Sequence, residues 1–422
     1  MKKKHLLSAI TVVIIIACSA ISWGAGYVIS AHSVRSYALN NAYVAFTDAA
    51  DSAYFNPANM VWLEDGVMID LGATYAHNTS VEFDGTVLGV PASAGARSED
   101  SILPFVHFVS PKVGDWRFGL SIMEPAGMSK RWDSLMQMIT AEESYLGVIE
   151  INPTVAYMIT PRLSASAGVR FLYAEAELKA QLPPGMDPIL VQGYRQDMDG
   201  DTWETGFNLA LTFKVTDSLR LAATYRSEID MDIEGTGSGY TTNPFDSSIY
   251  AFNDASGKTS LPLPANLALA ISKTFDKTTL EFVYERTFWS AYDVLDLSFD
   301  DPIIELTFGQ PRPQDWDDTS SFRVGVSYQF SDSLKLMGGA SYEETPVPAQ
   351  TIGFDIPESD ILWFSLGAAY SFNPKMELGF ACSYGYYKER TIEVADANVN
   401  GIVGTFNDSS FISATASFRY LF

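Results

Sequence analysis

The chain has 422 residues, of which 47% are apolar and 13% aromatic, and its 27 basic residues are outnumbered by 51 acidic ones, for a formal net charge of −24. That charge excludes a nucleic-acid-binding surface, because phosphate backbones attract basic proteins. Only two cysteines are present, Cys18 and Cys382. Since Cys18 falls in a cleavable leader, the mature chain has no disulfide and its stability must come from the fold.

The amino terminus has the three parts of a secretory signal peptide. Lys2, Lys3 and Lys4 precede an apolar run, residues 6–21, which is too short for a membrane-spanning helix, and a small residue, Gly24, follows it. We expect cleavage after Gly24, so that residues 1–24 are removed. A lipoprotein signal with Cys18 as the lipid acceptor is the alternative, and it would change the anchoring only.

Residues 25–65 form a segment of different composition, rich in Ala, Asn and Asp. A helix is predicted within residues 36–46, and Asp48, Asp51 and Ser52 are suited to cap short turns. The segment also carries five aromatic side chains, which a disordered periplasmic tail would not need: Tyr37, Tyr43, Phe46, Tyr54 and Phe55. We predict that it fills the lumen of a β-barrel as an N-terminal hatch, because a wide barrel has room for such a segment.

From about residue 66 to the end, apolar and polar residues alternate in segments of about ten residues. In one of them Val67, Ile69 and Leu71 share one parity, whereas Asp70 and Gly72 take the other. This period of two is typical of a strand with one apolar and one polar face. Fourteen such segments lie near residues 67–77, 102–110, 116–124, 147–159, 163–174, 202–214, 219–231, 263–274, 279–289, 320–330, 334–343, 361–372, 376–387 and 411–422.

The connections between these segments alternate between tight turns and loops of roughly 15 to 30 residues, far longer than most connections in compact domains. This asymmetry and the even number of strands are typical of outer-membrane barrels. We therefore predict an all-β fold in which residues 66–422 form a 14-stranded antiparallel transmembrane β-barrel in the outer membrane of a Gram-negative cell. The barrel is expected to be a monomer in contact with lipid and lipopolysaccharide. The C-terminal Phe422 resembles the signal that barrel-assembly machinery reads.

Several motifs in this order resemble the FadL family of outer-membrane transporters for long-chain fatty acids and other hydrophobic compounds. The matching motifs are Ala25-Gly26-Tyr27 at the mature start, Asn56-Pro57-Ala58 in the hatch, Thr224-Tyr225-Arg226-Ser227, Leu263-Pro264-Ala265, and Pro346-Val347-Pro348-Ala349-Gln350 followed by Ile356-Pro357, Asp360 and Trp363. The resemblance implies a capture groove built by the third and fourth outer loops, residues 175–201 and 232–262. It also implies a buried pocket at the start of the hatch and lateral release beside a kinked third strand, residues 116–124.

Candidate ligand-binding residues follow from the resemblance and are Phe46, Tyr54, Phe55, Met123, Glu175, Leu182, Met186, Leu190, Asp317 and Trp363. Glu175 and Asp317 stand where fatty-acid-handling relatives place basic residues. An acid there would repel a carboxylate by about 1 kcal/mol at contact. The sequence therefore favours neutral hydrocarbons or aromatic compounds over fatty acids as ligands, unless Lys179 or Arg312 supplies the missing positive charge.

We expect passive uptake of hydrophobic compounds, and the alternatives are a general porin, an adhesive barrel or an outer-membrane lipid hydrolase. A hydrolase would need a serine with a histidine and an orienting partner. The mature histidines, His32, His77 and His107, are scattered and no serine-centred motif accompanies them. We therefore expect no catalytic residues, and three isolated histidines also predict no metal site and no cofactor.

Overall fold

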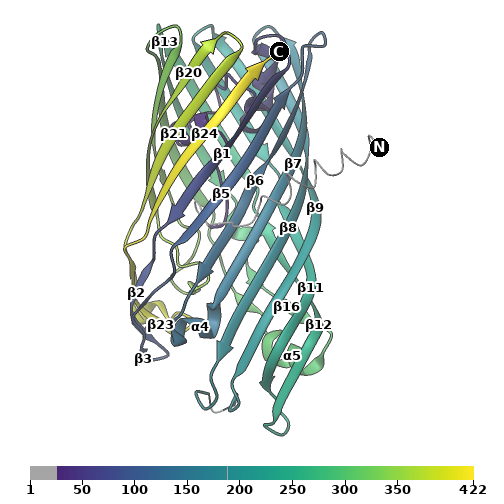
Figure 1. Cartoon of the computed structure of the whole chain (residues 1–422), viewed down its shortest axis with the longest axis vertical. Helices are drawn as coiled ribbons and strands as arrows, with labels where there is room; N and C mark the ends of the chain where they lie inside the picture. Colours follow the sequence, from purple (N-terminus) through teal and green to yellow (C-terminus); the bar gives the residue numbers. More distant parts are fainter. Residues whose placement is uncertain (1–25, 188) are drawn as a thin grey trace.

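The computed structural model describes residues 26–187 and 189–422, and the predicted signal peptide and Ala25 lie outside these residues. The sheet closes into a barrel because the first strand, β1 (Met68–Asn78), pairs antiparallel with both β24 (Ser410–Leu421) and β5 (Glu99–Val109) (Figure 1). Within the described residues, no helix is long and apolar enough to cross a membrane.

The predicted number of barrel strands is confirmed. Besides β1, β5 and β24, the wall contains β6 (Trp116–Arg131), β7 (Glu143–Thr160), β8 (Leu163–Leu182), β9 (Tyr194–Thr216), β10 (Leu219–Arg226) continued by β11 (Ile229–Thr242), β12 (Ile249–Leu263) continued by β13 (Asn266–Phe275), β14 (Thr278–Thr287), β18 (Thr319–Gln329), β19 (Leu334–Glu343), β20 (Ile361–Asn373) and β21 (Met376–Tyr387). When each interrupted strand, β10–β11 and β12–β13, is counted once, the described part of the wall has fourteen strands.

The outer surface of the barrel is apolar, as the alternation predicts. In β9, for example, Phe207, Leu209 and Leu211 are exposed, whereas Asn208 and Thr212 are buried inside. Exposed rings continue around the wall at Tyr75, Trp116, Phe282, Phe322, Tyr370 and Phe380. Only lipid can cover such a belt favourably, because apolar surface in water costs about 25 cal/mol per Å².

The two ends of the barrel differ. The end that carries the C-terminus has short turns, at the top of Figure 1, whereas β8, β9, β11 and β12 reach far beyond the other strands at the opposite end. The prediction of long loops at residues 175–201 and 232–262 was wrong, since β8–β9 and β11–β12 continue as paired strands and leave only residues 183–193 and 243–248 as connections. We refer to these two ends as the short-turn end and the long end.

Smaller elements cover the long end. One group is a five-stranded sheet of β2 (Glu82–Val87), β3 (Val90–Pro91), β4 (Ala94–Gly95), β22 (Arg390–Ile392) and β23 (Ile402–Asn407), with η3 (Val394–Asp396) between β22 and β23. A second group consists of η2 (Trp289–Ala291), β15 (Val294–Leu295), β16 (Leu297–Phe299), α5 (Pro302–Phe308) and β17 (Arg312–Pro313). The helix α4 (Leu135–Ala141) follows β6. Phe83 and Phe406 of the small sheet pack against Phe354 and Trp132. This aromatic contact joins four separate connections into one cap.

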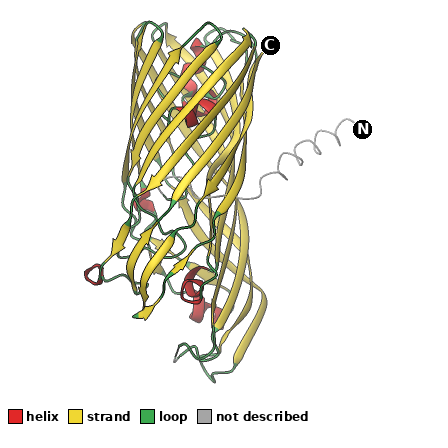
Figure 2. Cartoon of the chain, turned by 60° about the vertical axis from the view of Figure 1, so that its left-hand side comes forward, coloured by secondary structure: helices red, strands yellow, loops and turns green. Residues whose placement is uncertain are grey.

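Residues 26–65 lie inside the barrel, mostly towards the short-turn end, where Figure 2 shows their helices in red. We call them the luminal segment. It contains α2 (Val34–Ala38), α3 (Ser52–Phe55) and η1 (Pro57–Trp62), and α2 contacts β19, β20, β21 and β24 whereas η1 contacts β7 and β8. The helix predicted within residues 36–46 is shorter, because Asn40 and Asn41 adopt left-handed backbone angles, φ 46° and 58°, that end it.

Polar side chains hold the luminal segment to the wall. Arg35 donates to Asp48 within the segment at 2.8 Å and to Glu377 of β21 at 2.7 Å. Glu281 of β14 accepts hydrogen bonds from three consecutive backbone amides, those of Val44, Ala45 and Phe46, at 2.5, 2.6 and 2.9 Å. Charged groups inside a protein are stable only when they are paired in this way, so these contacts fix the segment in one orientation.

Candidate functional site

An apolar pocket lies inside the long end of the barrel, between the extended strands. It encloses about 890 Å³ of empty space, including the part open to solvent. Its apolar lining comes from β6, β7, β8, β9, β11, β12, β16 and nearby connections and consists of Met128, Leu146, Ala176, Leu178, Met198, Ile233, Leu261, Leu295, Leu297, Phe299 and Ile356. We call it the outer pocket.

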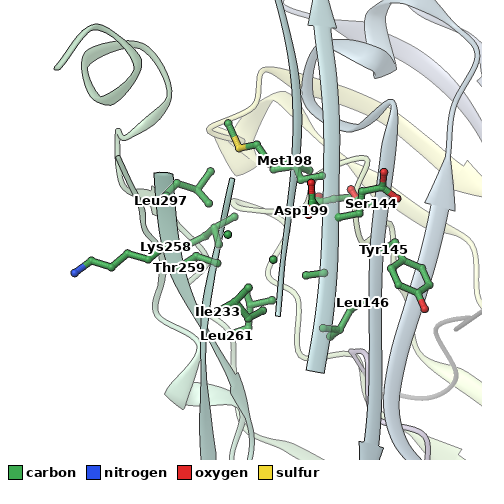
Figure 3. A pocket seen from close by; sticks show the side chains of 18 of the residues that line it. Ser144, Tyr145, Leu146, Met198, Asp199, Ile233, Lys258, Thr259, Leu261 and Leu297 are labelled. Atoms are coloured by element: carbon green, nitrogen blue, oxygen red, sulfur yellow. The ribbon is translucent and has the colours of Figure 1, made fainter. Parts of the chain in front are cut away.

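The alternation of the extended strands turns these side chains inward. In β9, Met198 is buried and lines the pocket, whereas Asp197 and Asp201 do not line it and Asp199, which does, is exposed. Figure 3 shows Ile233 and Leu261 on one side of the space and Leu146 on the other. Lys258 also contributes to the lining, but its ammonium group extends away from these apolar side chains in the same view. Residues 197–201, which the resemblance placed in the third outer loop, therefore belong to a strand with one face on the pocket.

The start of the luminal segment borders this pocket. Tyr27 is buried, and its ring centroid lies 4.9 Å from that of Trp289, 6.2 Å from Tyr292 and 5.9 Å from Trp316. Its hydroxyl donates to the carbonyl of Pro262 at 2.5 Å. Gly26 precedes it with φ +70°, and an added Cβ would lie 2.4 Å from Trp289, so only glycine fits here. Tyr27 and Tyr292 line the pocket, which gives it an aromatic floor.

The charged groups around the pocket are mainly acidic. Lys258 is the only lysine or arginine in the described lining, which also contains Glu177, Asp199 and Asp355. Glu358 lies in the same connection as Asp355, and its Oε2 accepts a hydrogen bond from the amide of Gly26 at 2.7 Å. Burial raises the pKa of Glu358 well above its usual range, and burial also raises the pKa of Asp355. These acidic groups favour an uncharged ligand over a carboxylate.

The barrel wall is interrupted beside β6. β5 pairs with β6 only from Val106 to Val109, opposite residues 119–122, although β6 stays paired with β7 as far as Arg131. The register of β6 shifts between Met123 and Ala126, where Glu124 and Pro125 form a bulge. A proline has no amide hydrogen to donate, so the ladder is broken at this point. Beyond the bulge, towards the long end, one edge of β6 is left without a strand partner in the described ladder.

The luminal segment binds to that edge. Val28 forms an isolated antiparallel bridge with Ala126. The amide of Ile29 donates to the carbonyl of Pro125, and the amide of Gly127 donates to the carbonyl of Tyr27, both at 2.9 Å. Residues 26–29 thus connect the floor of the outer pocket with the interruption in the wall, and one movement of this stretch would change both.

The ten candidate ligand-binding residues are distributed over the molecule, and none of them is among the described residues that line the outer pocket. Tyr54, Phe55 and Met123 meet Phe105 in one buried cluster beneath the wall interruption. Phe46 packs against Arg220, Leu182 is buried at the end of β8, Met186 is exposed, and Leu190 lies in the connection that follows β8. Glu175 accepts from the hydroxyl of Tyr145 at 3.1 Å, Asp317 donates its amide to Pro346, and Trp363 lines a different cavity.

The predicted hatch residues have structural tasks. Ala25 lies outside the described residues, and Gly26 packs against Trp289 and Trp316 just before Tyr27 of the pocket floor. Asn56 is completely buried; its side-chain oxygen accepts from the amide of Ala58 and its amide group donates to Val44 and Thr212. Pro57 takes the first position of η1, where its missing amide hydrogen costs nothing.

The rings of His107 and His77 also have hydrogen-bond partners. His107 contacts Ser121 Oγ through Nδ1 at 2.9 Å and the backbone oxygen of His32 through Nε2 at 2.8 Å. His77 pairs with Asp100 near the barrel exterior. With both ring nitrogens of His107 occupied and its side chain buried beneath the luminal segment, the Ser121–His107 pair does not have the free, exposed base that a hydrolase needs.

Many of the pocket residues that sequence reasoning missed belong to strands that were taken for loops. The alternation of Ala176 and Leu178 in β8, and of Ile233 with its acidic neighbours Asp232 and Glu234 in β11, was the available signal. The aromatic floor gave a weaker signal, because Tyr27 and Tyr292 are far apart in the sequence.

Comparisons with known proteins agree with this architecture. A family model described as "Outer membrane protein transport protein (OMPP1/FadL/TodX)" matches residues 15–422. Relatives include the long-chain fatty acid transport protein of Salmonella typhi, 24% identical with 91% of this chain and 93% of that protein covered. Outer membrane protein P1 of Haemophilus influenzae is 24% identical, with 86% of this chain and 83% of that protein covered.

Solved structures show the same fold. A FadL homologue of Pseudomonas aeruginosa matches with a TM-score of 0.81 and 21% identity, covering 94% of this chain and 100% of that one. The toluene transporter TodX of P. putida matches with a TM-score of 0.73 and 19% identity, covering 93% and 98%. The family match spans the barrel and the luminal segment, so the chain belongs to the OMPP1/FadL/TodX family of outer-membrane transport proteins.

Proposed function

We propose that this transporter takes up small, neutral hydrophobic molecules, which enter the outer pocket and leave sideways through the wall beside β6. The observation that carries the proposal is the chemistry of the pocket. Its lining is apolar and aromatic, and the one cationic side chain among the described lining residues extends away from it. Some relatives carry names that refer to fatty acids and others to toluene; the pocket of this chain fits the second class better.

Burial of apolar surface supplies the driving force for capture. A ligand that removes about 200 Å² of its surface from water gains about 5 kcal/mol before the costs of association. No charge pairing is needed for this gain. A carboxylate would instead lose its hydration near Asp355 and Glu177, so its binding would be weaker by the cost of burying an unpaired charge.

Residues 26–29 are proposed to act as the gate, and the rest of the luminal segment as the hatch that blocks free diffusion. Tyr27 contributes to the floor of the pocket and Val28 bridges to the free edge of β6. A ligand shifts the equilibrium between the closed and the open gate only if it binds the two states with different affinity. A molecule that fills the pocket and displaces Tyr27 meets that condition, because it favours the state in which the edge of β6 is released.

The test is uptake of toluene and of a long-chain fatty acid by cells that lack their own transporter. Leu261→Trp should fill the outer pocket and lower toluene uptake at least 10-fold (about 1.4 kcal/mol). Leu209→Trp, on the lipid-facing side of β9, is the matched control and should leave uptake unchanged. Preference for the fatty acid, or normal toluene uptake by Leu261→Trp, would refute the proposal.

A general porin is the competing function, and conductance separates the two. With the luminal segment intact we expect purified protein in a planar bilayer to conduct few ions, whereas a porin would conduct freely. We also propose that the protein is a monomer in contact with lipopolysaccharide and that the exposed Phe422 is recognised by the barrel-assembly machinery. Deletion of Phe422 should then lower the amount of assembled barrel without changing the stability of the barrels that form.

A further inference from the structure

A second cavity lies inside the barrel, on the other side of the first residues of the luminal segment. It takes in about 350 Å³ of empty space, including the part open to solvent, and is walled by residues 29–31 of that segment, by α2 and its end, and by the inner faces of β18, β19, β20 and β21. It shares no lining residue with the outer pocket. We call it the luminal cavity.

The luminal cavity is lined by buried polar groups that lack partners. Asn40 Nδ2, Arg323 Nε, Ser341 Oγ and Trp363 Nε1 make no hydrogen bond in the structure, and these residues are only 3% to 8% exposed. Each unpaired buried polar group costs about 1–3 kcal/mol. Four of them around one cavity indicate that a bound molecule normally supplies their partners.

The type of partner follows from the type of atom. Asn40 Nδ2, Arg323 Nε and Trp363 Nε1 can only donate, and Ser341 Oγ can donate or accept. The half-buried Asn41 Oδ1 is an unpaired acceptor in the same lining. Donors therefore exceed acceptors, which suits a ligand oxygen that accepts several hydrogen bonds, with or without one hydrogen to give in return.

Charge excludes an anion or a cation as the preferred ligand. Arg323 is already paired with Glu343, which also lines the cavity, and with Glu285 at 2.9 Å. An anion would meet the Glu343 carboxylate without a free positive charge to balance it, and a cation would meet the unpaired N–H groups. A neutral oxygen avoids both penalties, while the indole of Trp363 and the side chain of Ile29 offer apolar surface beside it.

We propose that the luminal cavity is a second ligand-binding site, specific for the neutral hydroxyl or carbonyl group of an otherwise apolar molecule. The site goes beyond the proposed uptake function, since occupancy can be measured whether or not toluene is transported. It adds selectivity to the protein, because hydrocarbons satisfy the outer pocket alone, whereas phenols, alcohols and ketones also satisfy the luminal cavity.

The experiment compares 4-bromophenol with bromobenzene, which differ by one hydroxyl group. Crystals of the purified protein soaked in each compound should show bromine anomalous signal in the luminal cavity for 4-bromophenol only. In solution, Trp363→Phe combined with Ser341→Ala should lower the affinity for 4-bromophenol at least 10-fold. The same variant should change the affinity for bromobenzene less than twofold. Leu261→Trp, which fills the outer pocket, should show the reverse pattern.

Two results would overturn the proposal. The first is a luminal cavity that holds only ordered water after soaking in 4-bromophenol. The second is an unchanged 4-bromophenol affinity when the N–H and hydroxyl groups are removed. Should the double variant fail to assemble, Ser341→Ala alone makes the same test, with an expected threefold or larger loss. Loss of toluene uptake in cells bears on the proposed function only, so the two failures remain distinguishable.

Discussion

The two halves of the barrel interior differ in chemistry although the wall is continuous. Towards the short-turn end, inward side chains such as Glu281 and Glu377 bind the luminal segment through charged hydrogen bonds. At the long end, inward side chains such as Leu146, Ile233 and Leu261 leave an apolar space. The same alternation of a strand thus builds a socket for protein in one half and a pocket for a ligand in the other.

The stretch of residues 26–31 lies at the boundary between these halves. It borders the outer pocket, the edge of β6 and the luminal cavity. Its described contacts include backbone hydrogen bonds to Pro125 and Gly127 and one from Gly26 to Glu358, rather than the ion pairs that hold Arg35 and Asp48. This difference is consistent with the gate proposed above, in which this stretch moves and the remainder of the luminal segment stays fixed.

The largest effect is expected for Arg35→Ala. The substitution leaves Asp48 and Glu377 without a shared cation in the barrel interior, and loss of one partner of a buried ion pair costs about 3–5 kcal/mol. We expect a lower unfolding free energy and a higher ion conductance, measured by urea denaturation and in planar bilayers. Arg97→Ala, which removes an exposed pair with Asp133, is the control and should change neither.

Glu281→Ala should have the next largest effect. It removes the acceptor of three consecutive amides, those of Val44, Ala45 and Phe46, and we expect a loss of about 3 kcal/mol. The luminal segment should become sensitive to protease in the folded barrel. Glu281→Gln keeps one acceptor oxygen and should be affected less. Equal protease resistance of Glu281→Ala and the wild type would show that this carboxylate does not anchor the segment.

Asn56→Ala is expected to cost about 2 kcal/mol, because it removes the cap of η1 and leaves the carbonyl of Val44 short of a buried donor. The measurement is the midpoint of thermal unfolding, monitored by the change in the gel mobility of the barrel. Thr212→Val removes only one of the bonds made by Asn56 and should lower the midpoint by less. If Thr212→Val were the more damaging change, the cap would not be the main task of Asn56.

The smallest predicted effect concerns pH and the contact between Glu358 and Gly26. Burial raises the pKa of Glu358, so the folded protein keeps a proton that the unfolded chain releases. This contribution to stability is fully present below the usual pKa of a glutamate and declines as pH rises from there towards the raised pKa. Glu358→Gln should remove part of the decline, on the order of 1 kcal/mol, and Asp355, whose pKa burial also raises, should retain the rest.

Unfolding free energies measured from about pH 4 to pH 8 check this expectation. The glutamine variant should match the wild type at the acidic end of that range and exceed it at the neutral end. Its oxygen can still accept from the amide of Gly26, so the stretch of residues 26–31 should keep its position. A variant that is less stable than the wild type throughout would mean that the charged form of Glu358 is the one that holds Gly26.

Local patterns in the sequence were enough to identify the barrel. A strand with lipid on one side and a lumen on the other must alternate, so Phe207, Asn208 and Leu209 reveal their orientation without any knowledge of neighbouring strands. The composition of residues 25–65 likewise pointed to a segment inside the lumen. The error lay at the long end, where residues 175–201 were assigned to an outer loop although Asp197 and Asp201, which do not line the pocket, belong to a strand.

The binding sites were decided by the closed barrel. Alternation tells which side of β11 Ile233 occupies, but only the register of the sheet and the length of the extended strands bring it opposite Leu146 of β7. Likewise Asn40, Arg323 and Trp363 are far apart in the chain. They form one lining only because the fold brings residues 29–31 beside β18, β19 and β20. The sequence by itself determined the inward and outward faces because they depend on neighbouring residues, whereas the pockets depend on contacts between residues far apart in the chain.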